Sequence, residues 1–149
     1  MPLAYDTASD AAHPRLALTA LWTSTMFVVA FVDIFAFYRA DVRAQIEAGR
    51  AFVFTIDDAF LLGIVLYVAI PALMIAGSAL LPRRINRVAQ IVVASAFALT
   101  IVGAAIGERT YYLVASGIEL ALLAGIVIIA TRWKSARRSD RRLAAAALG

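Results

Sequence analysis

Four runs of apolar residues, separated by short polar segments, make up most of the chain. They cover residues 16–38, 58–81, 88–106 and 111–131. Each run is about 20 residues long, and a helix of that length crosses the roughly 30 Å hydrocarbon core of a bilayer. The pattern therefore predicts an all-α membrane protein, an antiparallel four-helix transmembrane bundle that forms one domain over residues 16–133.

The polar segments predict the ends of the chain and its first connection. Residues 1–15 are small and polar, which is typical of a disordered tail, and residues 134–149 form a second, basic tail that we expect to rest on anionic lipid. The first apolar run exceeds the 7 to 15 residues of a signal peptide, so we expect it to remain in place. In the first connection we expect a short interfacial helix over residues 41–48, a turn at Gly49 and an extended part.

Composition and charge agree with a membrane location and predict an orientation. The chain is 63% hydrophobic, and its mean hydropathy is +0.86. Ten of its basic residues lie in the two tails and the second connection, and four lie in the first and third connections. The positive-inside rule then places both termini in the cytoplasm. All but one of the 14 basic residues are arginine, which is typical of GC-rich bacterial genes, so we expect a bacterial inner membrane.

Several classes of function are disfavoured by what the sequence lacks. It has no cysteine, and its one histidine, His13, lies in the N-terminal tail. Disulfides, thiolate metal sites, iron–sulfur clusters and paired-histidine haem sites are therefore excluded. Nucleotide-binding and hydrolase motifs are missing as well. We expect no enzyme, cofactor or metal site. The arginines flank apolar runs, as membrane topology requires, so we expect no nucleic-acid partner.

The fourth run carries the strongest candidate for a functional residue, Glu119, near its middle. Tyr112, Ser116 and Glu119 are spaced i, i+4 and i+7, so they share one face of a helix. A carboxylate at this depth costs about 2.5 to 3.5 kcal/mol on insertion scales, and it indicates a functional site by default. Asp33 in the first run lies at a similar depth, which would let the two carboxyls share a site. Alternatively, Asp33 is neutral or bonded to a neighbour such as Arg39, and serves packing only.

The second run contains a helix breaker and a hydroxyl at mid-depth. Pro71 removes one backbone hydrogen bond, which predicts a kink near Tyr67 and, with it, a local cavity. Asp57 and Asp58 stand at the start of this run, where a helix N-terminus favours negative charge. We expect capping there, with Asp58 also at the outer mouth of the bundle.

A set of short segments resembles a known family. The segments are Leu21-Trp22, residues 38–42, Phe60-Leu61-Leu62-Gly63, Ile70-Pro71 with Met74, Arg84-Ile85-Asn86-Arg87, and Tyr111-Tyr112 with Glu119. In order and spacing they are similar to a family of small four-helix prokaryotic membrane proteins catalogued as domain of unknown function 6326. The resemblance implies a four-helix membrane fold without an established activity. It points to six positions to test: Asp41, Pro71, Asn86, Arg87, Tyr112 and Glu119.

Three interpretations of Glu119 remain open. In the first, the protein is a binding or accessory protein, whose pocket holds a lipid-like or small amphipathic ligand, or which docks on a larger membrane complex. That pocket would be lined by Asp33, Tyr67, Pro71, Tyr112, Ser116 and Glu119. In the second, the protein is a small transporter that works as a homo-oligomer, and Glu119 takes up and releases a proton. In the third, Glu119 only bonds Ser116 and Asp33 across helices. A carboxylate chemistry using Asp33 and Glu119 is a minor further alternative.

Overall fold

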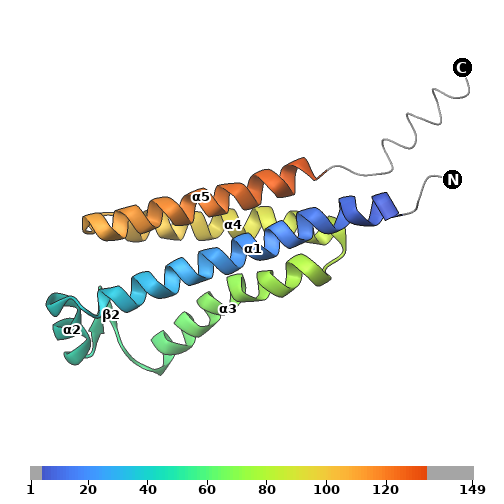
Figure 1. Cartoon of the computed structure of the whole chain (residues 1–149). Helices are drawn as coiled ribbons and strands as arrows, with labels where there is room; N and C mark the ends of the chain where they lie inside the picture. Colours follow the sequence, from blue (N-terminus) through green and yellow to red (C-terminus); the bar gives the residue numbers. More distant parts are fainter. Residues whose placement is uncertain (1–4, 134–149) are drawn as a thin grey trace, which may run out of the picture.

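The structure is a computed structural model that describes residues 5–133, with side chains from Pro14 onward. Its elements are α1 Tyr5–Ala36, α2 Ala40–Glu47, β1 Arg50–Ala51, β2 Phe54–Thr55, α3 Asp58–Leu80, α4 Arg83–Ala105 and α5 Thr110–Arg132 (Figure 1). Four segments are long and apolar enough to cross a membrane: Pro14–Ala36, Asp58–Leu80, Arg83–Ala105 and Thr110–Arg132. The all-α class and the four apolar helices are thus confirmed, and the predicted basic tail at 134–149 lies outside the described residues.

Helix α1 begins earlier than the apolar pattern predicts. Its first residue is Tyr5, so the helix extends through most of the segment 1–15 that we expected to be disordered. Alanine, the strongest helix former, is frequent in this segment and favours continuation of the helix. Pro14 lies inside the helix, where it removes a single backbone hydrogen bond.

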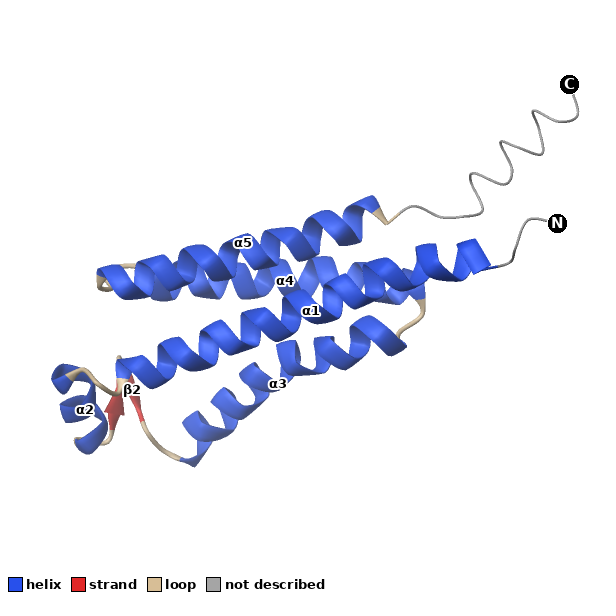
Figure 2. Ribbon diagram, in the orientation of Figure 1, coloured by secondary structure: helices blue, strands red, loops and turns tan. Residues whose placement is uncertain are grey.

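The first connection folds as a helix and a hairpin. Helix α2 occupies the segment in which we expected an interfacial helix, and Gly49 follows it with a φ of 70° that glycine adopts without strain. Strands β1 and β2 then pair antiparallel, with Arg50 opposite Thr55. Figure 2 shows this small unit at the end of α1 that lies away from both termini. We call this side the hairpin end of the helices, and the side of Arg15, Leu81 and Trp133 the terminal end.

The four long helices pack unequally. Helix α5 packs on α4 and on α1, and α1 packs on α3, whereas α3 meets α4 much less. Helix α3 diverges from the others toward the hairpin end, and it changes direction near its middle, where Pro71 lies (Figure 1). All side chains from Leu61 to Val68 are consequently exposed in the isolated chain. The predicted kink is therefore present, and the half of α3 before it is loosely packed.

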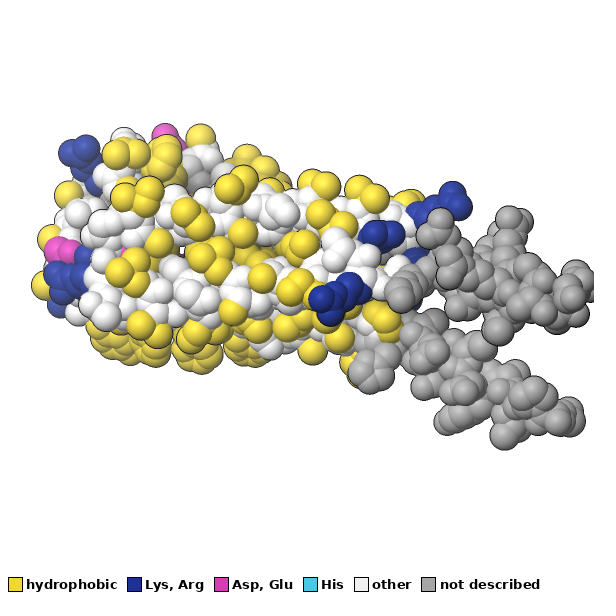
Figure 3. Space-filling view, turned by 90° about the horizontal axis from the view of Figure 1, so that it is seen from above, with side chains coloured by type: hydrophobic (Ala, Val, Ile, Leu, Met, Phe, Trp, Pro, Cys, Tyr) yellow, Lys and Arg dark blue, Asp and Glu magenta, His cyan; other side chains and the backbone are white. Residues whose placement is uncertain are grey.

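The surface of the helices is apolar along their length, and their charged groups lie at the two ends (Figure 3). Large side chains such as Phe27, Leu62, Leu73 and Leu99 are more than half exposed, which suits contact with lipid rather than with water. The compact core belongs mainly to α1, α4 and α5; its buried members include Leu18, Trp22, Ala94, Phe97, Leu123 and Ile126.

A polar network fixes the helices to one another toward the terminal end. The indole N–H of Trp22 on α1 donates to Oε1 of Gln90 on α4. Nε2 of Gln90 donates to Oγ of Ser78 on α3 and to Oδ1 of Asn86, both at 2.8 Å. Asn86 in turn donates to the Ser78 carbonyl at 2.8 Å. These four side chains are fully buried. Because lipid offers no hydrogen bonds, the side chains must satisfy one another.

Arginines complete this end of the bundle. Arg15 donates to the carbonyl oxygens of Ala79, in the last turn of α3, and of Leu81, directly after it, and so satisfies acceptors that a helix C-terminus leaves open. Arg83 donates to the Trp133 carbonyl at 2.8 Å. The guanidinium groups of Arg15 and Arg83 lie 5.8 and 5.6 Å from the centre of the Trp133 ring.

The network predicts that Gln90→Leu destabilises the protein. The substitution leaves the Trp22 indole N–H and Oδ1 of Asn86 without their partner in an apolar interior, whereas the Ser78 hydroxyl still donates to the Met74 carbonyl. We expect the free energy of unfolding in detergent to fall by about 1 to 2 kcal/mol. Ser95→Leu, on the exposed face of the same helix, is the control and should leave stability nearly unchanged. Equal stability of the two variants would contradict the role assigned to the network.

Candidate functional site

The centre of the candidate site is the carboxyl group of Glu119. The packed face of α5 carries Glu119 among small and apolar side chains, and only 5% of its surface is exposed. None of the side chains described from Pro14 to Trp133 makes a hydrogen bond to it. Every fully buried side-chain nitrogen or oxygen of the described residues does have a hydrogen-bond partner. The carboxyl oxygens of Glu119 must therefore still reach accessible space, although the residue is 95% covered.

Four of the predicted residues lie on three helices: Asp33 on α1, Tyr67 on α3, and Tyr112 and Glu119 on α5. Tyr112 lies about two turns before Glu119 on the same helix. Asp33 and Tyr67 are exposed in the isolated chain, whereas Tyr112 is partly buried. That Asp33 and Glu119 share one site stays a prediction.

Tyr67 forms the main link between α3 and α4 at this level. Its ring stacks on that of Phe97, with 4.9 Å between the ring centres, and its hydroxyl lies 2.7 Å from Oγ1 of Thr100. The side chain of Tyr67 is nevertheless 37% exposed. The tyrosine therefore links α3 to α4 and still leaves part of its side chain exposed. Thr100 and Phe97 did not stand out in the sequence.

Ser116 and Pro71, the remaining two residues of the predicted pocket, are both buried. Ser116 lies one turn before Glu119 and is 4% exposed, and Pro71 is fully buried one turn after Tyr67. Among the described side chains, no hydrogen bond joins Glu119 to Ser116 or to Asp33. The structure thus does not contain the bonds on which a purely structural role of Glu119 would depend.

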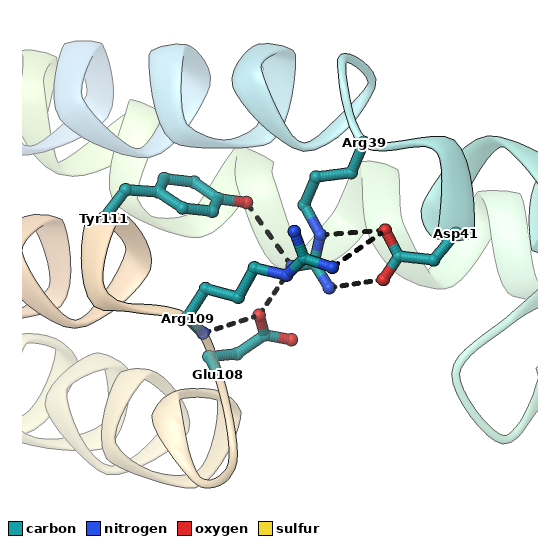
Figure 4. A network of polar contacts seen from close by, with 5 residues as sticks. All are labelled: Arg39, Asp41, Glu108, Arg109 and Tyr111. Carbon is teal, nitrogen blue, oxygen red and sulfur yellow. Dashed lines mark hydrogen bonds and ion pairs between the residues drawn. The ribbon is translucent and has the colours of Figure 1, made fainter.

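A separate polar network closes the hairpin end (Figure 4). The guanidinium group of Arg39, at the end of α1, donates to Asp41 and to Glu108, each at 2.7 Å. It also approaches the Tyr111 hydroxyl at 3.5 Å. Arg109 adds a longer ion pair to Asp41, at 3.7 Å. The network ties the start of α2 to the turn between α4 and α5, and it engages Arg39 with partners other than Asp33.

The ion pair between Arg39 and Asp41 shifts the pKa values of both side chains. Hydrogen bonds from Arg39 lower the pKa of Asp41 from 3.8 to about 2, and those same contacts raise the pKa of Arg39 above its ordinary value. The Asp41 side chain is 45% exposed, so water screens much of this interaction. Asp41, to which the family resemblance points, is therefore an ion-pair residue that positions α2.

Other predicted positions lie apart from Glu119. Asp57, not Asp58, caps α3 by accepting the Phe60 N–H at 2.8 Å, and Asp58 lies exposed in the first turn. Asn86 belongs to the buried network near the terminal end. Arg87, also there, donates to the Thr131 carbonyl at 3.1 Å. Within the described part of the chain, no three histidine, cysteine, aspartate or glutamate side chains group closely enough to hold a metal ion.

Comparison with known families assigns the chain to one of them. The model of a family of unknown function, DUF6326, matches residues 10–139. The chain belongs to this family. For this member of DUF6326, no curated protein and no solved structure shows a match. The chemistry of the site therefore has to be argued from its own residues.

The residues that the sequence did not single out are those that act through partners distant in the chain. In this DUF6326 member Ser78 lies in an apolar run and Glu108 in a short turn, where no local pattern marks them, and Trp22 stood out only through the family resemblance. Their common feature is polarity at the edge or inside of a membrane helix. Such groups need hydrogen-bond partners within the protein, and this requirement is the one feature that distinguishes them in the sequence.

The Arg39–Asp41 ion pair predicts a pH dependence of stability. Because the pKa of Asp41 is lower in the folded protein, the pair contributes fully above the unfolded value of 3.8 and is lost as the pH falls toward 2. We expect wild type to be more stable than Asp41→Asn at neutral pH, measured by thermal unfolding. The difference should stay nearly constant down to about pH 5, shrink as the pH falls through about 2 and vanish below it. A difference that persists undiminished through about pH 2 would show that Asp41 acts through something other than its charge.

Proposed function

We propose that this protein binds a lipid-like or small amphipathic ligand in an intramembrane polar pocket around Glu119. The four long helices would form an antiparallel transmembrane bundle in a bacterial inner membrane, with both termini in the cytoplasm. The observation that supports this proposal is the state of Glu119, a carboxyl group that is 95% covered, lacks a partner among the described residues and retains access at its oxygens.

Energetics favour a partner from outside the chain. A carboxylate near the bilayer centre costs about 2.5 to 3.5 kcal/mol, and Glu119 recovers none of this through hydrogen bonds within the described structure. A ligand that donates hydrogen bonds or carries charge would recover it. The neighbouring half of α3 is loosely packed, so it can move aside with the loss of few contacts. The pocket would then lie between α3 and the other three helices.

In this proposal the lipid bilayer is the first partner of the protein, and a larger membrane complex is a possible second one. The bundle would act by binding and not as an enzyme, without cofactor or nucleic acid. Asp33, Tyr112 and Ser116 would line the pocket together with Glu119, and Tyr67 and Pro71 would shape the side that α3 provides.

A second candidate function is a small oligomeric transporter coupled to protons. The presence of two carboxyls, Asp33 and Glu119, in apolar helices supports it, because carboxyls that lie close together in an apolar environment can share one proton and release it when a substrate binds. This candidate requires a homo-oligomer and proton-linked uptake that Glu119→Gln abolishes. The binding function requires neither.

The orientation can be tested with single cysteines, because the chain contains none of its own. Glu47→Cys in α2 should react with a membrane-impermeant maleimide added to intact spheroplasts. Arg84→Cys, at the terminal end, should react only after the membrane is opened. Both side chains are exposed, so access depends on the side of the membrane alone. The reverse pattern would place both termini outside.

Native mass spectrometry of protein released from mild detergent tests the binding function. We expect wild type to retain a defined non-bulk molecule and Glu119→Gln to lose most of it, since the variant removes the charge with little change in size. Glu47→Gln removes the same charge from exposed helix α2 and should behave as wild type.

Two outcomes would contradict the proposed binding function. If wild type and Glu119→Gln carry the same molecule in the same amount, Glu119 is not part of a ligand site. If wild type is an empty, stable oligomer and Glu119→Gln abolishes proton-linked uptake, the transporter is the better explanation.

A further inference from the structure

An open groove runs along one face of α4, from the terminal end toward the middle of the helix. Its volume is about 550 Å³, and it is lined by Arg84, Ile85, Val88, Ala89, Val92 and Val93. These residues form two adjacent rows with a spacing of four, so they share one face of the helix. The groove is thus apolar along its length and carries a positive charge, that of Arg84, at the terminal end.

The length and position of the groove match one leaflet of a bilayer. From Arg84 to Val93 the helix advances about 14 Å, and one leaflet contributes about 15 Å of hydrocarbon, half of the whole core. Arg84 is the second residue of α4, so it lies where a helix of this length leaves the hydrocarbon. Trp133 lies at the same end, and tryptophan is enriched at this interface. An acyl chain in the groove would therefore bring its headgroup to Arg84.

The charge of the terminal end favours an anionic headgroup. The arginines at this end, among the described side chains, are Arg15, Arg83, Arg84, Arg87 and Arg132. The acidic side chains described from Pro14 to Trp133 lie in the middle of the helices or toward the hairpin end. On the face that Figure 3 shows, the basic groups of the terminal end have no acidic neighbour. Clusters of this kind beside membrane helices attract anionic lipids.

Arg84 is the arginine of this cluster that is available to a headgroup in the groove. Arg83 and Arg87 each donate to a backbone carbonyl of α5 or its end. The Arg84 side chain is exposed, and no hydrogen bond joins it to another residue between Pro14 and Trp133. A guanidinium group and a phosphate form strong, charge-assisted hydrogen bonds.

A second copy of the chain fits the groove less well than a lipid does. In a two-fold dimer packed through this face of α4, with its axis along the membrane normal, both terminal ends would lie at the same level. Arg84 would then approach its symmetry mate, and like charges across an interface repel. An anionic lipid meets the same arginine with the opposite charge.

We propose that the α4 groove is a binding site for one anionic phospholipid, with its phosphate at Arg84 and an acyl chain along Val88 and Val92. The groove does not include Glu119, so this site is separate from the proposed pocket and does not depend on it.

Native mass spectrometry of the full chain, titrated in mild detergent with palmitoyl-oleoyl-phosphatidylglycerol, tests this proposal. Phosphatidylcholine with the same acyl chains is the zwitterionic comparison. We expect wild type to bind one phosphatidylglycerol more tightly than phosphatidylcholine. Arg84→Gln should raise the dissociation constant for phosphatidylglycerol about fivefold, because one cationic contact at the membrane surface is lost. Arg50→Gln, which removes an exposed arginine at the hairpin end, should bind as wild type.

A second pair of variants tests the apolar part of the groove. Val92→Trp fills the groove and should weaken phosphatidylglycerol binding, and Val92 is 60% exposed, so the larger side chain disturbs little packing. Val102→Trp places the same side chain on an exposed position of α4 beyond the groove and is the control. All variants are compared by gel filtration and circular dichroism, so that a misfolded one is recognised.

Photo-crosslinking locates the bound lipid. A phosphatidylglycerol with a diazirine in its acyl chain should label α4 between Arg84 and Val93, and excess unlabelled phosphatidylglycerol should suppress the labelling.

Three outcomes would overturn the proposal. If phosphatidylcholine binds as tightly and Arg84→Gln changes nothing, the groove makes only general contact with lipid. If the crosslinks fall on other helices, the anionic lipid binds elsewhere. If wild type is a dimer that Val92→Trp dissociates and Val102→Trp does not, with lipid binding unchanged, the groove is an interface between two copies of the chain.

Discussion

Polar groups in the hydrocarbon core of a membrane can be satisfied only by the protein itself or by something that it binds. This structure meets that requirement at both ends of its helices. Toward the terminal end, Trp22 and Gln90 belong to a closed set of buried hydrogen bonds, and at the hairpin end Arg39 joins Asp41 and Glu108. The one buried carboxyl between these networks, Glu119, has no such partner among the described residues. The satisfied ends hold the helices in place around an unsatisfied centre.

Helix α3 is the element of this arrangement that can adjust. Arg15 holds its last carbonyls, and Ser78 fixes its final turns to α4. Tyr67 supplies a further link at mid-depth. Every residue of the helix from Leu61 to Leu66, just before Tyr67, is exposed. Pro71 stands between the anchored and the loose half, where the missing backbone bond makes bending least costly. Movement of the loose half would leave the hydrogen bonds of the terminal end undisturbed.

Much of the fold could be predicted from the sequence, because a membrane helix must be apolar over a length that the bilayer fixes. The placement of Glu119 and Ser116 on a packed face followed from helical spacing. The Trp22–Gln90 bond could not be predicted, because it joins helices that are remote in the chain. Helices that are apolar on every side also leave their rotation undetermined. The helical start of α1 was missed because it depends on alanine propensity and not on apolar periodicity.

Glu119 differs energetically from the other polar groups that this protein buries or places beside apolar surface. Gln90 and Arg39 are also expensive groups in or near an apolar medium, but each recovers its cost through several hydrogen bonds. Glu119 stands in similarly apolar surroundings and gains no such bonds from the described residues. Leucine at this position would pack against α1 and α4 without any desolvation cost, so stability alone does not account for the carboxyl. A buried carboxyl that stability does not explain is the basis of the proposal that Glu119 binds a partner from outside the chain.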